Sequence, residues 1–115
     1  MRLHVELIHD PGCPNVEEAR DLLTSVLRES GVSAVWTEWS TADERCPDHA
    51  RGFGSPTILV NGDDVAPAPH PWEGRTNGEG QCCRVYRQED GGLKGVPPRS
   101  LLTQAVRSAL EPEAG

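Results

Sequence analysis

The chain has 115 residues, a length typical of one domain, and we expect residues 1–115 to form a single one. Its net charge of −7 disfavours nucleic-acid binding, because attraction to phosphates requires a basic surface. No apolar stretch approaches the roughly 20 residues of a membrane span, and the first residues lack the apolar run of a secretory signal. We therefore expect a cytoplasmic protein without membrane contact.

The first third of the sequence predicts a strand, a helix and a second strand. Apolar and polar residues alternate over residues 3–8, which is typical of a strand. Residues 9–12 have the composition of a turn. Beyond Pro14, apolar residues recur at helical spacing until Gly31, where the helix is expected to end. Alternation over residues 33–39 then predicts the second strand.

The rest of the chain predicts two more strands and a C-terminal helix. Residues 40–51 are compatible with a short helix, and the apolar residues 57–60 predict the third strand. Residues 62–81 are rich in Gly, Pro and charge and predict a long exposed loop. Residues 82–87 follow as the fourth strand, and apolar side chains at helical spacing over 101–110 predict the last helix.

The predicted order of elements is β-α-β-(α)-β-β-α. A strand–helix–strand opening implies two parallel strands with a right-handed crossover. The last two strands, joined by a loop, imply an antiparallel pair. We therefore expect an α/β fold with a four-stranded mixed sheet flanked by helices on both faces.

This order resembles the thioredoxin and glutaredoxin fold, and two short motifs strengthen the resemblance. The turn Gly12-Cys13-Pro14-Asn15 is similar to the redox-active turn of that family, and Gly54-Ser55-Pro56-Thr57 is similar to its cis-proline loop. The resemblance implies a thioredoxin-like fold with Cys13 as the nucleophile and Pro56 as the cis-proline beside it. The flanking residues of the two motifs would support them: Pro14, Asn15, Ser55 and Thr57.

Two further features refine the resemblance. The pair Gly91-Gly92 is similar to the glycines of glutaredoxins that approach the γ-glutamyl carboxylate of glutathione. The chain also resembles short actinobacterial thioredoxin-like proteins with a Gly-Cys-Pro-Asn turn, some of which are labelled alkylmercury lyase. However, Val16 stands three residues after Cys13, where a dithiol thioredoxin has its second cysteine. A monothiol mechanism, or a distant partner cysteine, would take the place of the dithiol.

The position of Cys13 suits a reactive thiol. A thiolate is both the nucleophile of disulfide exchange and a ligand of soft metals. Free N–H groups and the dipole at a helix N-terminus favour this charged form. The alternative is a buried structural cysteine at the end of a strand. His9 could support the thiolate as a nearby imidazolium, or it could be an ordinary turn residue.

The other three cysteines leave alternatives open. Cys46 could resolve a mixed disulfide or act as a second metal ligand, or it could be a thiol without a role. Cys82 and Cys83 are neighbours on a predicted strand, so their side chains would point to opposite faces. Three roles are therefore open for Cys82 and Cys83: packing in the core, a vicinal redox pair, or a soft-metal site. Such a metal site could include His49 or His70.

Together with the resemblance, these residues predict a monothiol thiol–disulfide oxidoreductase that acts on a protein or small-molecule disulfide. No tightly bound cofactor is expected, and glutathione or mycothiol would serve as the reductant. One alternative is a soft-metal or organomercurial binder, whose ligands would come from the four cysteines Cys13, Cys46, Cys82 and Cys83. Another is a redox-inactive thioredoxin-like scaffold that binds a partner and uses residues 62–81 as a specificity loop.

Overall fold

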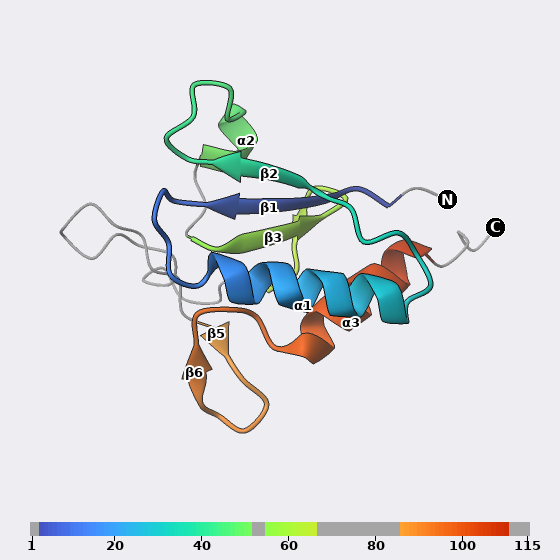
Figure 1. The fold of residues 1–115 in the computed structure, drawn as a ribbon. Helices are drawn as coiled ribbons and strands as arrows, with labels where there is room; N and C mark the ends of the chain where they lie inside the picture. The colour runs from blue at the N-terminus through green and yellow to red at the C-terminus, as the bar shows by residue number, and fades with distance from the viewer. Residues whose placement is uncertain (1–2, 52–54, 67–85, 111–115) are drawn as a thin grey trace.

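The computed structural model describes residues 3–51, 55–66 and 86–110 of the chain. These residues form an α/β fold in which a four-stranded mixed sheet is flanked by helices, which confirms that part of the prediction (Figure 1). A separate two-stranded sheet lies beside the helices.

The main sheet is built around β1 (Val5–His9). This strand pairs in parallel with β2 (Thr37–Ser40) and antiparallel with β3 (Thr57–Val60). A short strand, β4 (Asp63–Asp64), pairs antiparallel with β3 and completes the order β2-β1-β3-β4. The parallel pair is connected by the crossover helix α1 (Val16–Glu29), as the strand–helix–strand pattern predicts.

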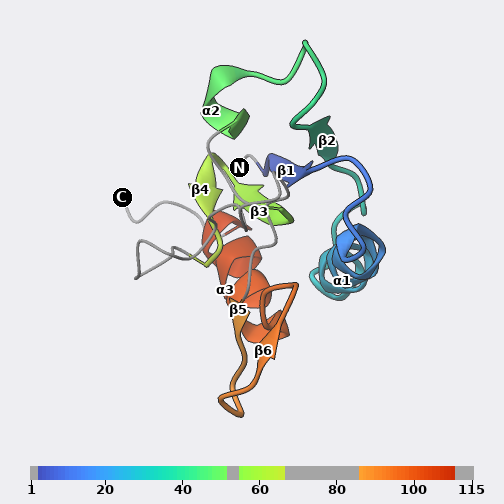
Figure 2. The same ribbon diagram turned by 90° about the vertical axis from the view of Figure 1, so that its left-hand side faces the viewer.

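Two long helices cover one face of this sheet. Apolar residues at helical spacing give α1 a buried stripe, and α3 (Arg99–Leu110) likewise buries Leu102 and Val106. Both helices lie on the same side of the sheet, whereas the short helix α2 (Asp48–Arg51) lies on the other (Figures 1 and 2). Among the described residues, no helix is long and apolar enough to cross a membrane.

Each face of the sheet has its own buried cluster. The larger core, between the sheet and helices α1 and α3, contains Val5, Leu7, Ala19, Leu23, Val26, Leu27, Ile58, Val60, Val65, Val96, Leu102 and Val106. The smaller core, on the α2 side, contains Ile8, Cys46, Ala50 and Leu59, with Trp39 packed against it. Successive side chains of a strand point to opposite faces, so one strand contributes to both cores.

The fourth strand of the sheet is not the predicted one. Strand β4 follows β3 directly through the turn Asn61-Gly62, in which both residues have positive φ angles. An Asn-Gly pair between two extended segments is a strong hairpin signal, but the Gly and Pro content of residues 62–81 led to the prediction of a loop. That prediction is wrong at residues 63–64, and residues 67–81 lie outside the described residues.

The predicted strand at residues 82–87 also differs. Its end, β5 (Tyr86–Arg87), pairs antiparallel with β6 (Leu93–Lys94) in the separate two-stranded sheet, not with β3. A turn over residues 88–92 connects the two strands. Cys82 and Cys83 lie outside the described residues.

The carboxylate of Glu6 is buried on the α2 side of the sheet, with only 5% of its side chain exposed. It accepts hydrogen bonds from the indole N–H of Trp39 at 2.8 Å and from Nε2 of His49 at 2.9 Å. Nε2 of His4 lies 3.7 Å from its other oxygen. Burial raises the pKa of Glu6, but the hydrogen bonds from His49 and Trp39 outweigh it, so the pKa lies below its ordinary value of 4.5.

Because of this carboxylate, the free energy of unfolding should depend on pH in the acid range. Because the pKa of Glu6 is lower in the folded than in the unfolded chain, its stabilising contribution is fully present above pH 4.5. The contribution is lost as the pH falls through the lower folded value. We expect Glu6→Gln to lower the free energy of unfolding by about 1–3 kcal/mol at neutral pH, and by less in acid. Urea unfolding of both proteins across this range measures the difference, and a constant difference at all pH values would contradict the assignment.

Candidate active site

Cys13 lies in the turn that connects β1 to α1. It stands two residues before Asn15, which caps the helix without a side-chain hydrogen bond to the first turn. The Cys13 N–H donates to the carbonyl of Asp10 at 3.2 Å, and its own carbonyl accepts from the N–H of Val16 at 3.4 Å. These backbone bonds fix the turn, while Cys13 itself is half-buried and its thiol is free.

Asp10 connects this turn to two other loops. Its N–H donates to the hydroxyl oxygen of Ser55 at 2.9 Å, and its carboxylate accepts a hydrogen bond from the hydroxyl of Thr41. The N–H of Thr41 also donates to the carbonyl of His9 at 2.9 Å. The Cys13 turn, the end of β2 and the loop before β3 are therefore held together at one end of the sheet.

The Ser55–Pro56 peptide bond in this loop is cis, the geometry that the resemblance implies. Ser55, Pro56 and Thr57 are all buried. The hydroxyl of Tyr86 donates to the carbonyl of Pro56. Sequence reasoning missed this contact, although a buried tyrosine usually finds a hydrogen-bond partner. The proline loop is thus fixed both by the Cys13 turn and by β5.

The glycines that precede the last helix have different surroundings. Gly91 and Gly92 lie in the exposed turn between β5 and β6, where the Gln88 N–H donates to the Gly92 carbonyl at 2.7 Å. The glycine that meets the Cys13 turn is Gly95. A Cβ atom at Gly95 would lie 2.2 Å from Nδ2 of Asn15, so the two segments touch only because this position has no side chain.

This close approach predicts the effect of a single methyl group. We expect Gly95→Ala to displace the Asn15 side chain and to destabilise the fold by about 1–3 kcal/mol. It should also change the alkylation rate of Cys13, two residues away. Asn15→Ala removes the atoms that clash, so the double variant should regain much of the lost stability. Urea unfolding and alkylation of all four proteins measure this coupling, and strictly additive effects would contradict it.

The imidazole ring of His9 lies near Glu38 of β2. Its Nε2 lies 4.0 Å from a carboxylate oxygen of Glu38, and its Nδ1 lies 3.3 Å from the Asp10 carbonyl. Glu38 also accepts from the guanidinium of Arg20 at 2.7 Å and from the indole of Trp36 at 3.1 Å. The Arg20 hydrogen bond holds the pKa of Glu38 below its ordinary value despite partial burial. Among the described residues, no interaction connects the His9 ring to the thiol of Cys13.

Cys46 belongs to the smaller core. Only 2% of it is exposed, and its sulfur lies 3.8 Å from the carbonyl of Pro47. It forms no disulfide with Cys13. The part of the chain that the structure describes contains no group of three or more His, Cys, Asp or Glu residues suited to a metal ion. His70, like Cys82 and Cys83, lies outside this part, and His49 is hydrogen-bonded to Glu6.

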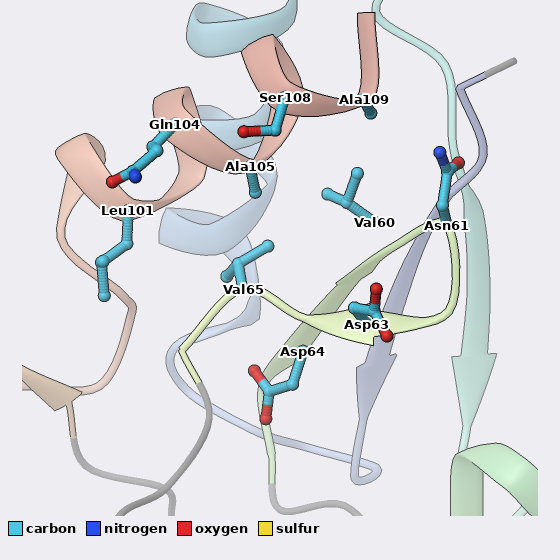
Figure 3. A pocket seen from close by; sticks show the side chains of 10 residues that line it. All are labelled: Val60, Asn61, Asp63, Asp64, Val65, Leu101, Gln104, Ala105, Ser108 and Ala109. Carbon is cyan, nitrogen blue, oxygen red and sulfur yellow. The ribbon is translucent and has the colours of Figure 1, made fainter. Parts of the chain in front are cut away.

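One pocket lies away from these loops, between β4 and α3 (Figure 3). It has a volume of about 490 Å³. Val60, Val65 and Ala105 form its apolar part, with Asp63 and Asp64 on the strand side. No residue of the Cys13 turn or of the proline loop lines it, so it is separate from the candidate active site.

No family model, curated protein or solved structure matches the chain. The chemistry of the site therefore has to follow from its own residues. A half-buried thiol stands before the first turn of α1, whose N–H groups are not capped by a side chain. Free N–H groups at the start of a helix are suited to bind an anionic group. The buried Ser55–Pro56 loop is joined to the Cys13 turn by the hydrogen bond from the Asp10 N–H to the Ser55 hydroxyl.

Proposed function

We propose that this protein is a thioredoxin-like thiol–disulfide oxidoreductase of monothiol type, with Cys13 as its nucleophile. The observation that carries the proposal is the hydrogen bond from Asp10 to Ser55, which holds the turn of a half-buried free thiol against the loop of Pro56. The two loops lie at the same end of the sheet, which supports a shared role for them.

The arrangement of the elements supports the thioredoxin-like part of the proposal. The sheet is mixed, with β1 between a parallel and an antiparallel neighbour. Helices α1 and α3 cover one face and α2 covers the other. The cysteine turn follows β1 and the proline loop precedes β3, so antiparallel pairing brings them to the same end of the sheet.

The reaction consists of two exchanges. The Cys13 thiolate attacks one sulfur of a disulfide, the S–S bond breaks, and the other sulfur leaves as a thiolate that takes a proton from water. A small thiol such as glutathione or mycothiol, in its thiolate form, then attacks the substrate sulfur of the mixed disulfide. This step releases the Cys13 thiolate and forms a new disulfide, so the small thiol supplies the electrons. Val16 occupies the position of a resolving thiol, which is why an external thiol is needed.

Reaction with a small neutral disulfide tests this function. The protein is incubated with bis(2-hydroxyethyl) disulfide, and each cysteine is then analysed by peptide mass spectrometry. We expect the first adduct on Cys13, faster than on free N-acetylcysteine at the same neutral pH, and its removal by a small thiol. An unreactive Cys13 would point instead to a redox-inactive scaffold. Adducts that form only on other cysteines would also overturn the proposal.

A further inference from the structure

A groove lies between α1 and the segment that leads from β6 into α3. It has a volume of about 390 Å³. Its floor contains Leu22, Val96 and Pro97, of which the last two are buried. Gly95 stands between the lining residues Lys94 and Val96 and lies against Asn15, so the segment that lines the groove contacts the chain two residues from Cys13.

The two walls of the groove carry opposite free charges. Glu18 and Asp21 are exposed on the α1 wall, and Lys94 is exposed on the β6 wall. Within the described residues, none of these three side chains has a hydrogen-bond or ion-pair partner. Arg99, the remaining charged residue of the groove, is already bound to Glu29 and donates to the hydroxyl of Ser25 at 2.9 Å.

The β6 wall is held in place by its neighbours. The side-chain amide of Gln88 donates to the carbonyl of Val96 at 2.9 Å and to that of Tyr86 at 3.3 Å. These bonds join the base of the β5–β6 hairpin to the segment before α3. Lys94 therefore faces the groove from a fixed element, across from an acidic helix wall, and the ammonium and the carboxylates do not pair with each other.

We propose that this groove binds the amino-acid part of a zwitterionic disulfide while Cys13 attacks its sulfur, an inference that rests on the proposed function. The ligand's ammonium group lies against Glu18 and Asp21, and its carboxylate lies against Lys94. The groove has two free carboxylates and one free ammonium, so a second carboxylate on the ligand would face an excess of negative charge. Cysteine-derived disulfides with one carboxylate per sulfur fit this pattern best.

With L-cystine the covalent step is the exchange already described. The Cys13 thiolate forms an S–S bond to one half of cystine, the original S–S bond breaks, and the other half leaves as the cysteine thiolate. No electrons enter or leave beyond those of the exchanged bonds. The groove changes only the rate, by holding the ligand near the thiolate.

Four small disulfides that differ in charge test the groove: zwitterionic L-cystine, cationic cystamine, anionic dithiodipropionate and neutral bis(2-hydroxyethyl) disulfide. Each rate at Cys13 is divided by the rate of the same disulfide with free N-acetylcysteine, which removes differences in intrinsic reactivity. We expect Glu18→Gln and Asp21→Asn to slow cystine and cystamine by about two- to fivefold each, the effect of an exposed ion pair. Lys94→Gln should slow cystine but not cystamine, and none of the three should change the neutral rate.

Glu17→Gln is the matched control. Glu17 is next to Glu18 in α1 but binds Arg20 and does not line the groove, so all four rates should stay unchanged. The differences should also shrink at high salt, because exposed charges are screened. Equal changes for all four disulfides in the groove variants would overturn the inference while leaving the proposed function intact.

Failure of the proposed function has a different signature. If Cys13 does not react even with the neutral disulfide, a ligand without an S–S bond tests the groove alone. S-methyl-L-cysteine is titrated into the isotope-labelled protein, and the amide chemical shifts are followed by NMR. Saturable amide shifts at Glu18 and Lys94 that are lost in Lys94→Gln would then keep the groove as an amino-acid site and reject only the redox role. Absence of such shifts would overturn both.

Discussion

Cys13→Ser should reduce the turnover of bis(2-hydroxyethyl) disulfide with a small thiol by roughly a hundredfold or more. A serine hydroxyl stays protonated near neutral pH and is a far weaker nucleophile than a thiolate. Serine is close to cysteine in size, and Cys13 is only half-buried, so urea unfolding should show little change in stability. Steady-state rates at several thiol concentrations, measured on protein shown to be folded, provide the comparison.

Cys46→Ala separates the monothiol mechanism from one with an internal resolving thiol. The Cys46 sulfur is buried in the smaller core, so its loss should lower stability modestly but leave turnover within about twofold. A folded Cys46→Ala protein that forms the Cys13 mixed disulfide but cannot release it would contradict the monothiol assignment. In that case, the segment that carries Cys46 would have to open during the reaction.

Leu102→Ala should be among the most destabilising single substitutions in the chain. Leu102 is fully buried in the larger core, where its removal leaves a cavity between α3 and the sheet. Leucine-to-alanine changes at such positions cost about 3–5 kcal/mol, a large part of the stability of a small domain. Urea unfolding followed by circular dichroism measures the loss.

The neighbouring leucine provides the control. Leu101 is 36% exposed and lies on the same helix, so Leu101→Ala has the same effect on helix propensity but removes less buried surface. We expect a loss below about 1 kcal/mol. Similar losses for the two substitutions would mean that α3 packs on the sheet with a different face.

The regular elements could be predicted because their residue patterns are local. The alternation in β1 and the helical spacing in α1 and α3 depend on residues a few positions apart, and each appears in the structure near its predicted position. The turn of Cys13 was recognisable for the same reason, since the cysteine, the following proline and the amphipathic helix are contiguous. Ser55 and Pro56 are predicted from a short contiguous motif by its resemblance to a known family, and not from hydrophobic periodicity.

Long-range contacts account for what the sequence could not predict. The Asn61-Gly62 turn is compatible with either a loop or a hairpin, and only the pairing of β4 with β3 decides between them. The contact between Gly95 and Asn15 joins positions 80 residues apart, and a glycine's lack of a side chain gives no sign of its partner. The burial of Glu6 was hidden for a similar reason, because its partner His49 is distant in the sequence.

The two faces of the sheet differ in how much apolar material holds their helices. Twelve buried residues form the cluster beneath α1 and α3, but only four form the cluster beneath α2 within the described residues. Segments with few buried contacts open at a lower free energy than the rest of a domain. Amide hydrogens of residues 42–51 should therefore exchange with solvent before those of α1. Brief openings of this side would also expose the Cys46 sulfur, which is buried in the closed state, to thiol reagents.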